Sequence, residues 1–172
     1  FNNICPTDKE FAPQLMDGCL QRHYPGAKKV LLLPEDNLKN AYYWENVNAI
    51  KTLLSEAGYE VRVGLPGLQE QDSTVLESYL GNKVSAEKIL SRDGKLRLKD
   101  FDPDVVISNN DFTKLYPHWG DTLHTPMTPS MELGWYQRRK SSYFEHFNRV
   151  ATEFAQILDV GNEVGIPAKH LR

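Results

Sequence analysis

The sequence is poor in cysteine and contains no long apolar run. Cys5 and Cys19 are its only cysteines, and they form neither a CxxC pair nor a disulfide framework of the secreted type. No N-x-[ST] glycosylation acceptor occurs, and no apolar stretch approaches the roughly 20 residues that span a membrane. We therefore expect an intracellular, reduced protein of the cytoplasm.

Several motifs that carry chemistry are also missing. The sequence has neither the phosphate-binding pattern G-x-x-x-x-G-K-[ST] nor G-x-G-x-x-G, and no serine lies in a G-x-S-x-G turn. Its histidines lack the H-E-x-x-H and H-x-x-x-H spacings of zinc sites. Aspartates at 100, 102, 104 and 111 match positions of a calcium loop, but Val105 replaces the turn glycine and Pro103 interrupts the loop. We therefore predict no metal site in this chain.

Charge of neither sign dominates. The net charge is -3 at pH 7, with 40% hydrophobic and 25% charged residues, which is typical of a folded globular protein. A general nucleic-acid binder would show a basic excess, so we expect neither nucleic acid nor membrane as a partner. The length of 172 residues fits one domain, or a domain plus the start of a second. Because the chain opens at Phe1 and stops at "AKHLR", we expect it to be part of a longer protein.

Hydrophobic spacing predicts a parallel α/β core. Residues 30–33 form a continuous apolar run before Pro34, which is typical of a strand buried on both faces. Residues 40–57 follow with apolar side chains at helical steps, and Gly58 supplies a left-handed stop. That helix face comprises Tyr43, Val47, Ile50, Leu54 and Ala57. The run "YEVRVG" then predicts a second strand, so the unit is βαβ and the sheet is at least partly parallel.

The remaining segments extend this core. Residues 105–107 predict a third parallel strand, and residues 74–98 an inserted hairpin or small meander with turn signals at Gly81-Asn82 and Asp93-Gly94. We expect an N-terminal helix over about 7–23, interrupted by Pro13 and Gly18, and a long structured loop over 112–137. The predicted fold is α/β: a small, mostly parallel sheet with flanking helices and an inserted β-hairpin.

A final helix is indicated after residue 140. Ser142 and Glu145 match an S-x-x-E capping box. Large apolar side chains then recur at helical steps, namely Phe144, Phe147, Ala151, Phe154 and Leu158. Such a stripe is expected to pack against another part of the protein.

Polar side chains follow two of the predicted strands. In open α/β sheets, ligands bind beyond the carboxyl ends of the strands. Ser108, Asn109, Asn110 and Asp111 leave the third strand and could present amides and a carboxylate to a polar ligand. The alternative is an Asx-turn that merely ends the strand. Residues 35–37, Glu-Asp-Asn, could likewise bind a ligand, but an N-cap with acids that complement the helix dipole is the favoured interpretation.

Three cations gather at the start of the final helix. Arg138, Arg139 and Lys140 are adjacent in "GWYQRRKSSYF", where a helix N-terminus already presents positive charge. Guanidinium groups at such an end form a good trap for carboxylate or phosphate, with Trp135 as a possible wall of the site. The alternative is a solvated run that pairs with Glu132 or Glu145.

These segments together resemble a protein family. "VLLLPEDNLKNAYYWENV", "FDPDVVISNNDFT" and "GWYQRRKSSYFEHFNRVATEFAQIL" are similar, over about residues 29–158, to the N-terminal portion of a proteobacterial glutamate–cysteine ligase of the ATP-grasp-like type. The resemblance implies a pre-ATP-grasp-like fold. We divide the chain accordingly into a helical segment at 1–28, an α/β substrate-side domain at 29–137, and at 138–172 a helix that leads toward a further domain not present in this chain.

The resemblance also implies a reaction. It would be the joining of the glutamate γ-carboxylate to the cysteine amine through an acyl phosphate, with ATP and Mg²⁺ held mainly by residues outside this chain. The predicted binders of the anionic substrate or phosphate are then Arg138, Arg139, Lys140 and Trp135, with Asn109, Asn110 and Asp111. Alternatives are another ATP-grasp ligase, such as a glutathione synthetase, or a non-catalytic α/β module that binds a small anion.

Overall fold

The computed structural model describes residues 10–68, 70–110, 112, 125–130, 145 and 147–148. The chain divides into two compact units, Phe1–Ser130 and Met131–Arg172, and nearly all of the described residues belong to the first. Within the described residues, no helix has the length and apolar character needed to cross a membrane.

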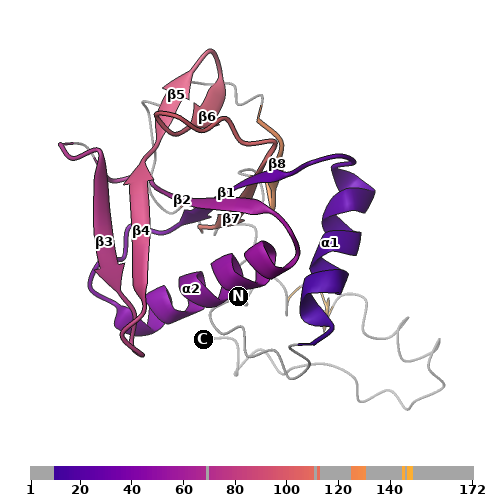
Figure 1. Ribbon diagram of the computed structural model, residues 1–172, viewed down its shortest axis with the longest axis horizontal. Coiled ribbons are helices and arrows are strands. Elements are labelled where there is room, and N and C mark those ends of the chain that lie inside the picture. The colour runs from indigo at the N-terminus through magenta and orange to yellow at the C-terminus, as the bar shows by residue number, and fades with distance from the viewer. Residues whose placement is uncertain are drawn as a thin grey trace. The chain divides into compact units, whose positions relative to one another are not determined.

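The first unit contains a six-stranded sheet in the order β3-β4-β2-β1-β7-β8 (Figure 1). The strands are β1 (Lys29–Pro34), β2 (Glu60–Leu65), β3 (Ser73–Glu77), β4 (Lys83–Lys88), β7 (Val105–Asn109) and β8 (Met127–Thr128). Only the β3–β4 pair is antiparallel; the other pairs are parallel. A separate hairpin comprises β5 (Leu90–Arg92) and β6 (Lys95–Arg97). The structure thus confirms a mostly parallel α/β sheet with flanking helices and an inserted hairpin.

The central strand β1 is buried on both faces, as its apolar run predicts. Val30 and Leu32 pack on the side of α1 (Ala12–His23) and α2 (Ala41–Glu56), whereas Leu31 and Leu33 pack on the side of the β5–β6 hairpin. Side chains alternate in this way because successive residues of a strand face opposite sides of the sheet. Figure 1 shows the result: both labelled helices lie on one side of β1, β2 and β7, and the hairpin lies on the other.

The helix side of the core is built around α2. Trp44, Val47, Ile50 and Leu54 are buried there, and each large side chain removed from water contributes about 1.5–3 kcal/mol. The helix ends as predicted, with Gly58 at a φ of 88°. On the opposite side, Ile89, Leu96, Leu98 and Phe101 form a second cluster with Val106 of β7.

The N-terminal helix differs from its prediction. Pro13 does not interrupt α1, because the helix begins at Ala12 and proline is tolerated in a first turn, where its missing N–H has no helical partner. Gly18 lies inside the helix without breaking it. The expected start near Thr7 lies outside the described residues.

Residues 74–98, predicted as an inserted hairpin or small meander, form two hairpins. The first, β3–β4, joins the main sheet because β4 pairs in parallel with β2. The second, β5–β6, turns at Asp93 and Gly94, which both have positive φ. Both predicted turn signals are confirmed, but only the second hairpin stands apart from the core sheet.

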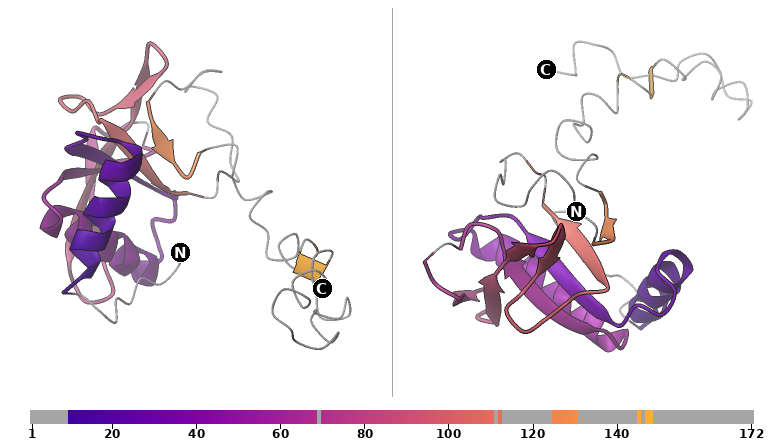
Figure 2. Two further views of the ribbon diagram at one scale, coloured as in Figure 1. Left: turned by 90° about the vertical axis from the view of Figure 1, so that its right-hand side faces the viewer. Right: turned by 90° about the horizontal axis from the view of Figure 1, so that it is seen from above.

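Later segments are described in part. Within the predicted loop at 112–137, Met127 and Thr128 form β8, which pairs with β7 at an edge of the sheet (orange in Figure 2). Glu145, Phe147 and Asn148 are helical, in agreement with the predicted final helix, whereas Ser142 of its capping box lies outside the described residues.

Candidate functional site

The carboxyl ends of three parallel strands meet at one edge of the sheet. β1 pairs with β2 on one side and β7 on the other, and Pro34 at the end of β1 is the register partner of Asn109 at the end of β7. Ligands of open α/β sheets bind in the crevice beyond such ends. We call this edge, with the loops that follow Pro34, Leu65 and Asn109, the carboxyl edge.

Tyr43 of α2 ties two of these loops together. Its hydroxyl accepts a hydrogen bond of 2.8 Å from the backbone N–H of Glu35 and donates one of 2.9 Å to the carbonyl oxygen of Asn109. The side-chain Nδ2 of Asn109 donates to the same hydroxyl over 3.3 Å. The loop after β1 and the end of β7 are therefore fixed relative to each other and to the first turn of α2.

Asn109 and Asn110, at the end of β7, make different contacts. Asn109 lies on the α2 side, where it meets Tyr43, and is half-buried. Asn110 is buried, with Nδ2 donating to Pro34 O over 3.0 Å and Oδ1 accepting from Phe112 N over 2.7 Å. Those contacts form an Asx-turn of the kind given above as the alternative. A ligand-binding role for Asn110 stays a prediction.

The loop after β2 is tied to the loop after β1. Gly67 N donates to Oδ1 of Asp36 over 2.7 Å, and the approach is so close that a Cβ at position 67 would lie 2.8 Å from Cγ of Asp36. The loop lines an open hollow of about 340 Å³ with Gly67, Leu68, Glu70 and Gln71. At the carboxyl edge, hydrogen bonds thus join the loops, and an open hollow lies beside the loop after β2.

The interpretation of residues 35–37 as an N-cap is wrong. The N-cap of α2 is Asn40, whose Oδ1 accepts from Tyr43 N over 3.1 Å, and the first turn of the helix holds no acidic residue. Asp36 is bonded to Gly67 instead, and the carbonyl oxygen of Asn37 accepts a hydrogen bond of 2.8 Å from the Trp44 indole. Residues 35–37 therefore shape the carboxyl edge rather than the helix terminus.

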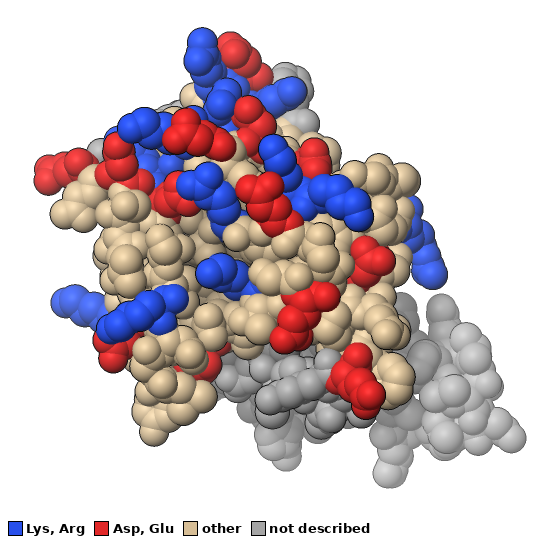
Figure 3. Space-filling model, in the orientation of Figure 1, with Lys and Arg blue, Asp and Glu red and all other residues tan. Residues whose placement is uncertain are grey.

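The other predicted binding residues, namely Asp111, Trp135, Arg138, Arg139 and Lys140, lie outside the described residues. The part of the chain that the structure describes contains no cluster of three or more His, Cys, Asp or Glu side chains suited to a metal ion. On the face in Figure 3, acidic and basic side chains are intermingled rather than gathered by sign.

Asp104 and Glu45 have lowered pKa values, and both carboxyl groups accept hydrogen bonds that hold the fold together. Hydrogen bonds from the backbone N–H groups of Lys28 and Lys29 lower the pKa of Asp104 and tie the start of β1 to the segment before β7. The Ser78 hydroxyl is the main cause of the lowered pKa of Glu45, which also accepts from Leu80 N in the β3–β4 turn.

Sequence reasoning missed two residues of the carboxyl edge. It placed Tyr43 only on the buried face of its helix, although a tyrosine in the first turn of a helix that follows a strand can reach the strand ends with its hydroxyl. Gly67 follows Pro66, and a Pro-Gly pair is a turn signal that marks the loop. Its close approach to Asp36 carries no local signal, since Asp36 is distant in sequence.

Comparisons with known proteins agree with this architecture. The chain matches the family model described as GshA, glutamate-cysteine ligase, over residues 1–168. No curated protein matches it. The fold is similar to the crystal structure of a protein from Methylobacillus flagellatus KT assigned as a gamma-glutamylcysteine synthetase, with a TM-score of 0.79 and 30% sequence identity. The match covers 93% of this chain and 38% of that protein, so the chain spans well under half of that protein's length. These findings confirm the resemblance: the chain belongs to the glutamate-cysteine ligase family.

Proposed function

We propose that the chain is the N-terminal, substrate-side part of a cytoplasmic, ATP-dependent ligase. The enzyme would join the γ-carboxylate of glutamate to the amine of cysteine, the first step of glutathione biosynthesis. The observation that carries this proposal is the family match over residues 1–168, which runs through nearly the whole chain. The name of the related crystal structure supports the same reaction class.

The proposed reaction proceeds through an acyl phosphate. An oxygen of the γ-carboxylate attacks the terminal phosphorus of ATP, and ADP leaves. The cysteine amine then attacks the acyl carbon and expels phosphate, which forms the amide bond. Such a reaction needs groups that hold phosphate and developing negative charge. We propose Arg138, Arg139 and Lys140, with Trp135 and Asp111, as residues of this chain that bind the anionic substrate or phosphate.

The described residues support a substrate-side role rather than a nucleotide site. Hydrogen bonds of Tyr43 and Asp36 join the loops of the carboxyl edge, and an open hollow lies beside the loop after β2. It offers no acidic cluster for Mg²⁺ within the described residues. We therefore propose that ATP and Mg²⁺ are bound mainly by parts of the protein beyond this chain.

Product analysis with the full-length protein that carries this chain tests the proposal. With glutamate, cysteine and magnesium–ATP, γ-glutamylcysteine and ADP should form. Glutathione formed from γ-glutamylcysteine and glycine, with no reaction of glutamate and cysteine, would assign a glutathione synthetase instead. No product from either pair would favour a non-catalytic anion-binding module.

A further inference from the structure

The hydroxyl of Tyr43 fixes the orientation of the Asn109 amide. A hydroxyl has one proton to donate and two lone pairs that accept. The Glu35 backbone N–H can only donate, and it occupies one lone pair over 2.8 Å. The Asn109 carbonyl oxygen can only accept, and it takes the hydroxyl proton over 2.9 Å. The contact of 3.3 Å with the Asn109 side chain is therefore made by Nδ2 as donor.

This orientation leaves Oδ1 of Asn109 as an acceptor. Within the described part of the chain, that oxygen has no hydrogen-bond partner. Asn110 offers no second amide of this kind, because its Nδ2 and Oδ1 bond to Pro34 and Phe112. The Asn109 side chain is half-buried and stands at the carboxyl edge, where the strand ends meet. A half-buried acceptor at such a place is suited to an N–H donor.

An amide oxygen discriminates between the charged groups of an amino acid. It attracts an ammonium group, whose N–H bonds are charge-assisted donors, and it repels a carboxylate or phosphate oxygen. Building on the ligase function proposed above, we propose that Oδ1 of Asn109 accepts a hydrogen bond from the ammonium or amine group of an amino-acid substrate. Tyr43 is the positioning residue that turns the amide oxygen toward that group.

Two substitutions at Asn109 test whether the group that it binds carries positive or negative charge. Asn109→Asp keeps an acceptor at Oδ1, whereas Asn109→Leu has a similar size and no polar atom. We expect Asn109→Leu to weaken glutamate or cysteine binding to the full-length protein by about tenfold, the effect of one charge-assisted hydrogen bond. Asn109→Asp should bind the same amino acid within a few-fold of the unsubstituted protein. If Asn109 bound an anion, Asn109→Asp would be the weaker of the two, which would overturn the proposal.

A substrate without the amino group separates contact from structural damage. Glutarate is glutamate without its α-amino group, so isothermal titration with both ligands isolates that group. If Asn109 binds the α-ammonium of glutamate, Asn109→Leu and Tyr43→Phe should lower the preference for glutamate over glutarate. If Asn109 instead binds the amine of cysteine, the preference for glutamate over glutarate should stay unchanged. Only the affinity for cysteine should then fall in the two variants. Equal losses for glutamate, glutarate and cysteine, or no loss in any, would contradict a direct contact.

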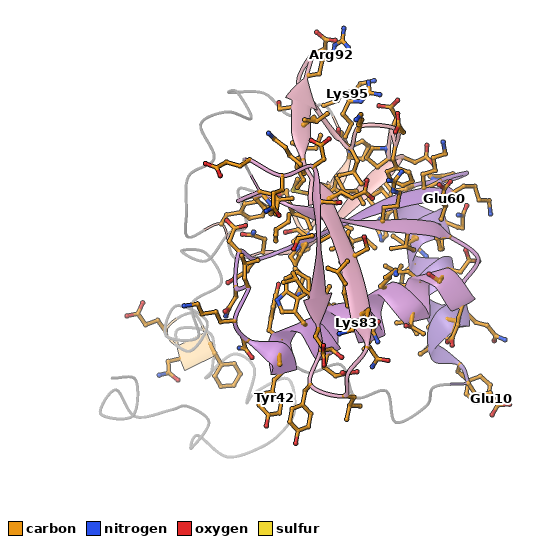
Figure 4. All side chains as sticks on the ribbon, turned by 60° about the vertical axis from the view of Figure 1, so that its left-hand side comes forward. Glu10, Tyr42, Glu60, Lys83, Arg92 and Lys95 are labelled. Atoms are coloured by element: carbon orange, nitrogen blue, oxygen red, sulfur yellow. The ribbon has the colours of Figure 1, made fainter. Side chains whose placement is uncertain are left out.

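Tyr42→Phe is the matched control for Tyr43→Phe. Tyr42, labelled in Figure 4, is the neighbouring residue in α2 and is 67% exposed. Its ring stacks on that of Tyr79. This control should leave all three affinities unchanged. Because titration measures binding without turnover, its result does not depend on the result of the product assay. Failure to form γ-glutamylcysteine would overturn the proposed function, whereas unchanged binding in Asn109→Leu would overturn this inference alone.

Discussion

The backbone N–H of Gly67 donates a hydrogen bond of 2.7 Å to Oδ1 of Asp36, which joins the loop after β2 to the loop after β1. A Cβ at residue 67 would lie 2.8–2.9 Å from the carboxylate atoms of Asp36. Contacts of that length require the carboxylate to move. A side chain at residue 67 would therefore disturb the hydrogen bond that joins the two loops.

We expect Gly67→Ala to displace Asp36 and weaken its hydrogen bond. The free energy of unfolding, measured by urea denaturation, should fall by about 1–2 kcal/mol. Gly18→Ala is the control, because a Cβ at position 18 of α1 meets nothing within 4 Å. That change should raise stability by about 0.5–1 kcal/mol, the usual gain of alanine over glycine inside a helix. Equal stability of the two variants would contradict the close contact at Gly67.

The Glu45 carboxylate should make stability depend on pH. Hydrogen bonds, foremost from Ser78, lower its pKa below the ordinary value of 4.5 in the folded protein. A lowered folded-state pKa gives stability that is present above the ordinary value and is lost as the pH falls through the folded-state pKa. Near neutral pH, Glu45→Gln should therefore cost about 1 kcal/mol, and this difference should shrink well below pH 4.5.

Ser78→Ala provides a second measurement of the same interaction. It removes the hydroxyl that donates to Glu45 over 2.5 Å. The free energy of unfolding should therefore fall less steeply with decreasing pH in this variant than in the unsubstituted protein. Urea denaturation over a series of acidic pH values follows both variants. Profiles that stay parallel to that of the unsubstituted protein would show that Glu45 is not the source of the pH dependence.

Arg138, Arg139 and Lys140 should contribute to substrate binding. If Arg138 and Arg139 hold an anionic group of the substrate or phosphate, alanine at either position should raise KM by about tenfold or more in the full-length protein, at the scale of one charge-assisted contact. Arg92→Ala is the control, since Arg92 is exposed at the tip of the β5–β6 hairpin (Figure 4). Unchanged KM and kcat in Arg138→Ala and Arg139→Ala would contradict the proposed role.

The 172-residue chain should bind nucleotide poorly by itself. The described residues provide no acidic cluster for a metal ion, and we propose that the ATP site lies mainly beyond this chain. Isothermal titration of the chain with magnesium–ATP should show no tight binding, whereas the full-length protein should bind it. Micromolar affinity of the chain alone would place the nucleotide site here and refute this part of the proposal.

The core of the fold was predictable because its signals are local. The continuous apolar run of β1, the helical spacing of α2 and the stop at Gly58 each depend on neighbouring residues alone, and all agree with the structure. The pairing of β4 with β2 was not predictable in this way. It depends on which strand of the folded sheet still has an unpaired edge, and neighbouring residues do not show that. The short strand β8 was not predictable for the same reason, because it forms only by pairing with β7.

The positions of Asn109 and Asn110 in the fold were predictable from the sequence, but their contacts were not. The rule that ligands bind beyond strand ends led to Asn109 and Asn110, and both lie at the carboxyl edge. Their different contacts follow from strand alternation combined with the reach of Tyr43, which required coordinates. The N-cap was misassigned because Asp36, Asn37 and Asn40 are all acceptable caps, and only the position where the helix starts discriminates between them.

Transfer of heavy oxygen tests the proposed ligase reaction most directly. The full-length protein would be incubated with magnesium–ATP, cysteine and glutamate whose γ-carboxylate carries the label. An acyl phosphate predicts that γ-glutamylcysteine forms and that each released phosphate carries one labelled oxygen from glutamate. Release of unlabelled phosphate, or no γ-glutamylcysteine at all, would contradict the account.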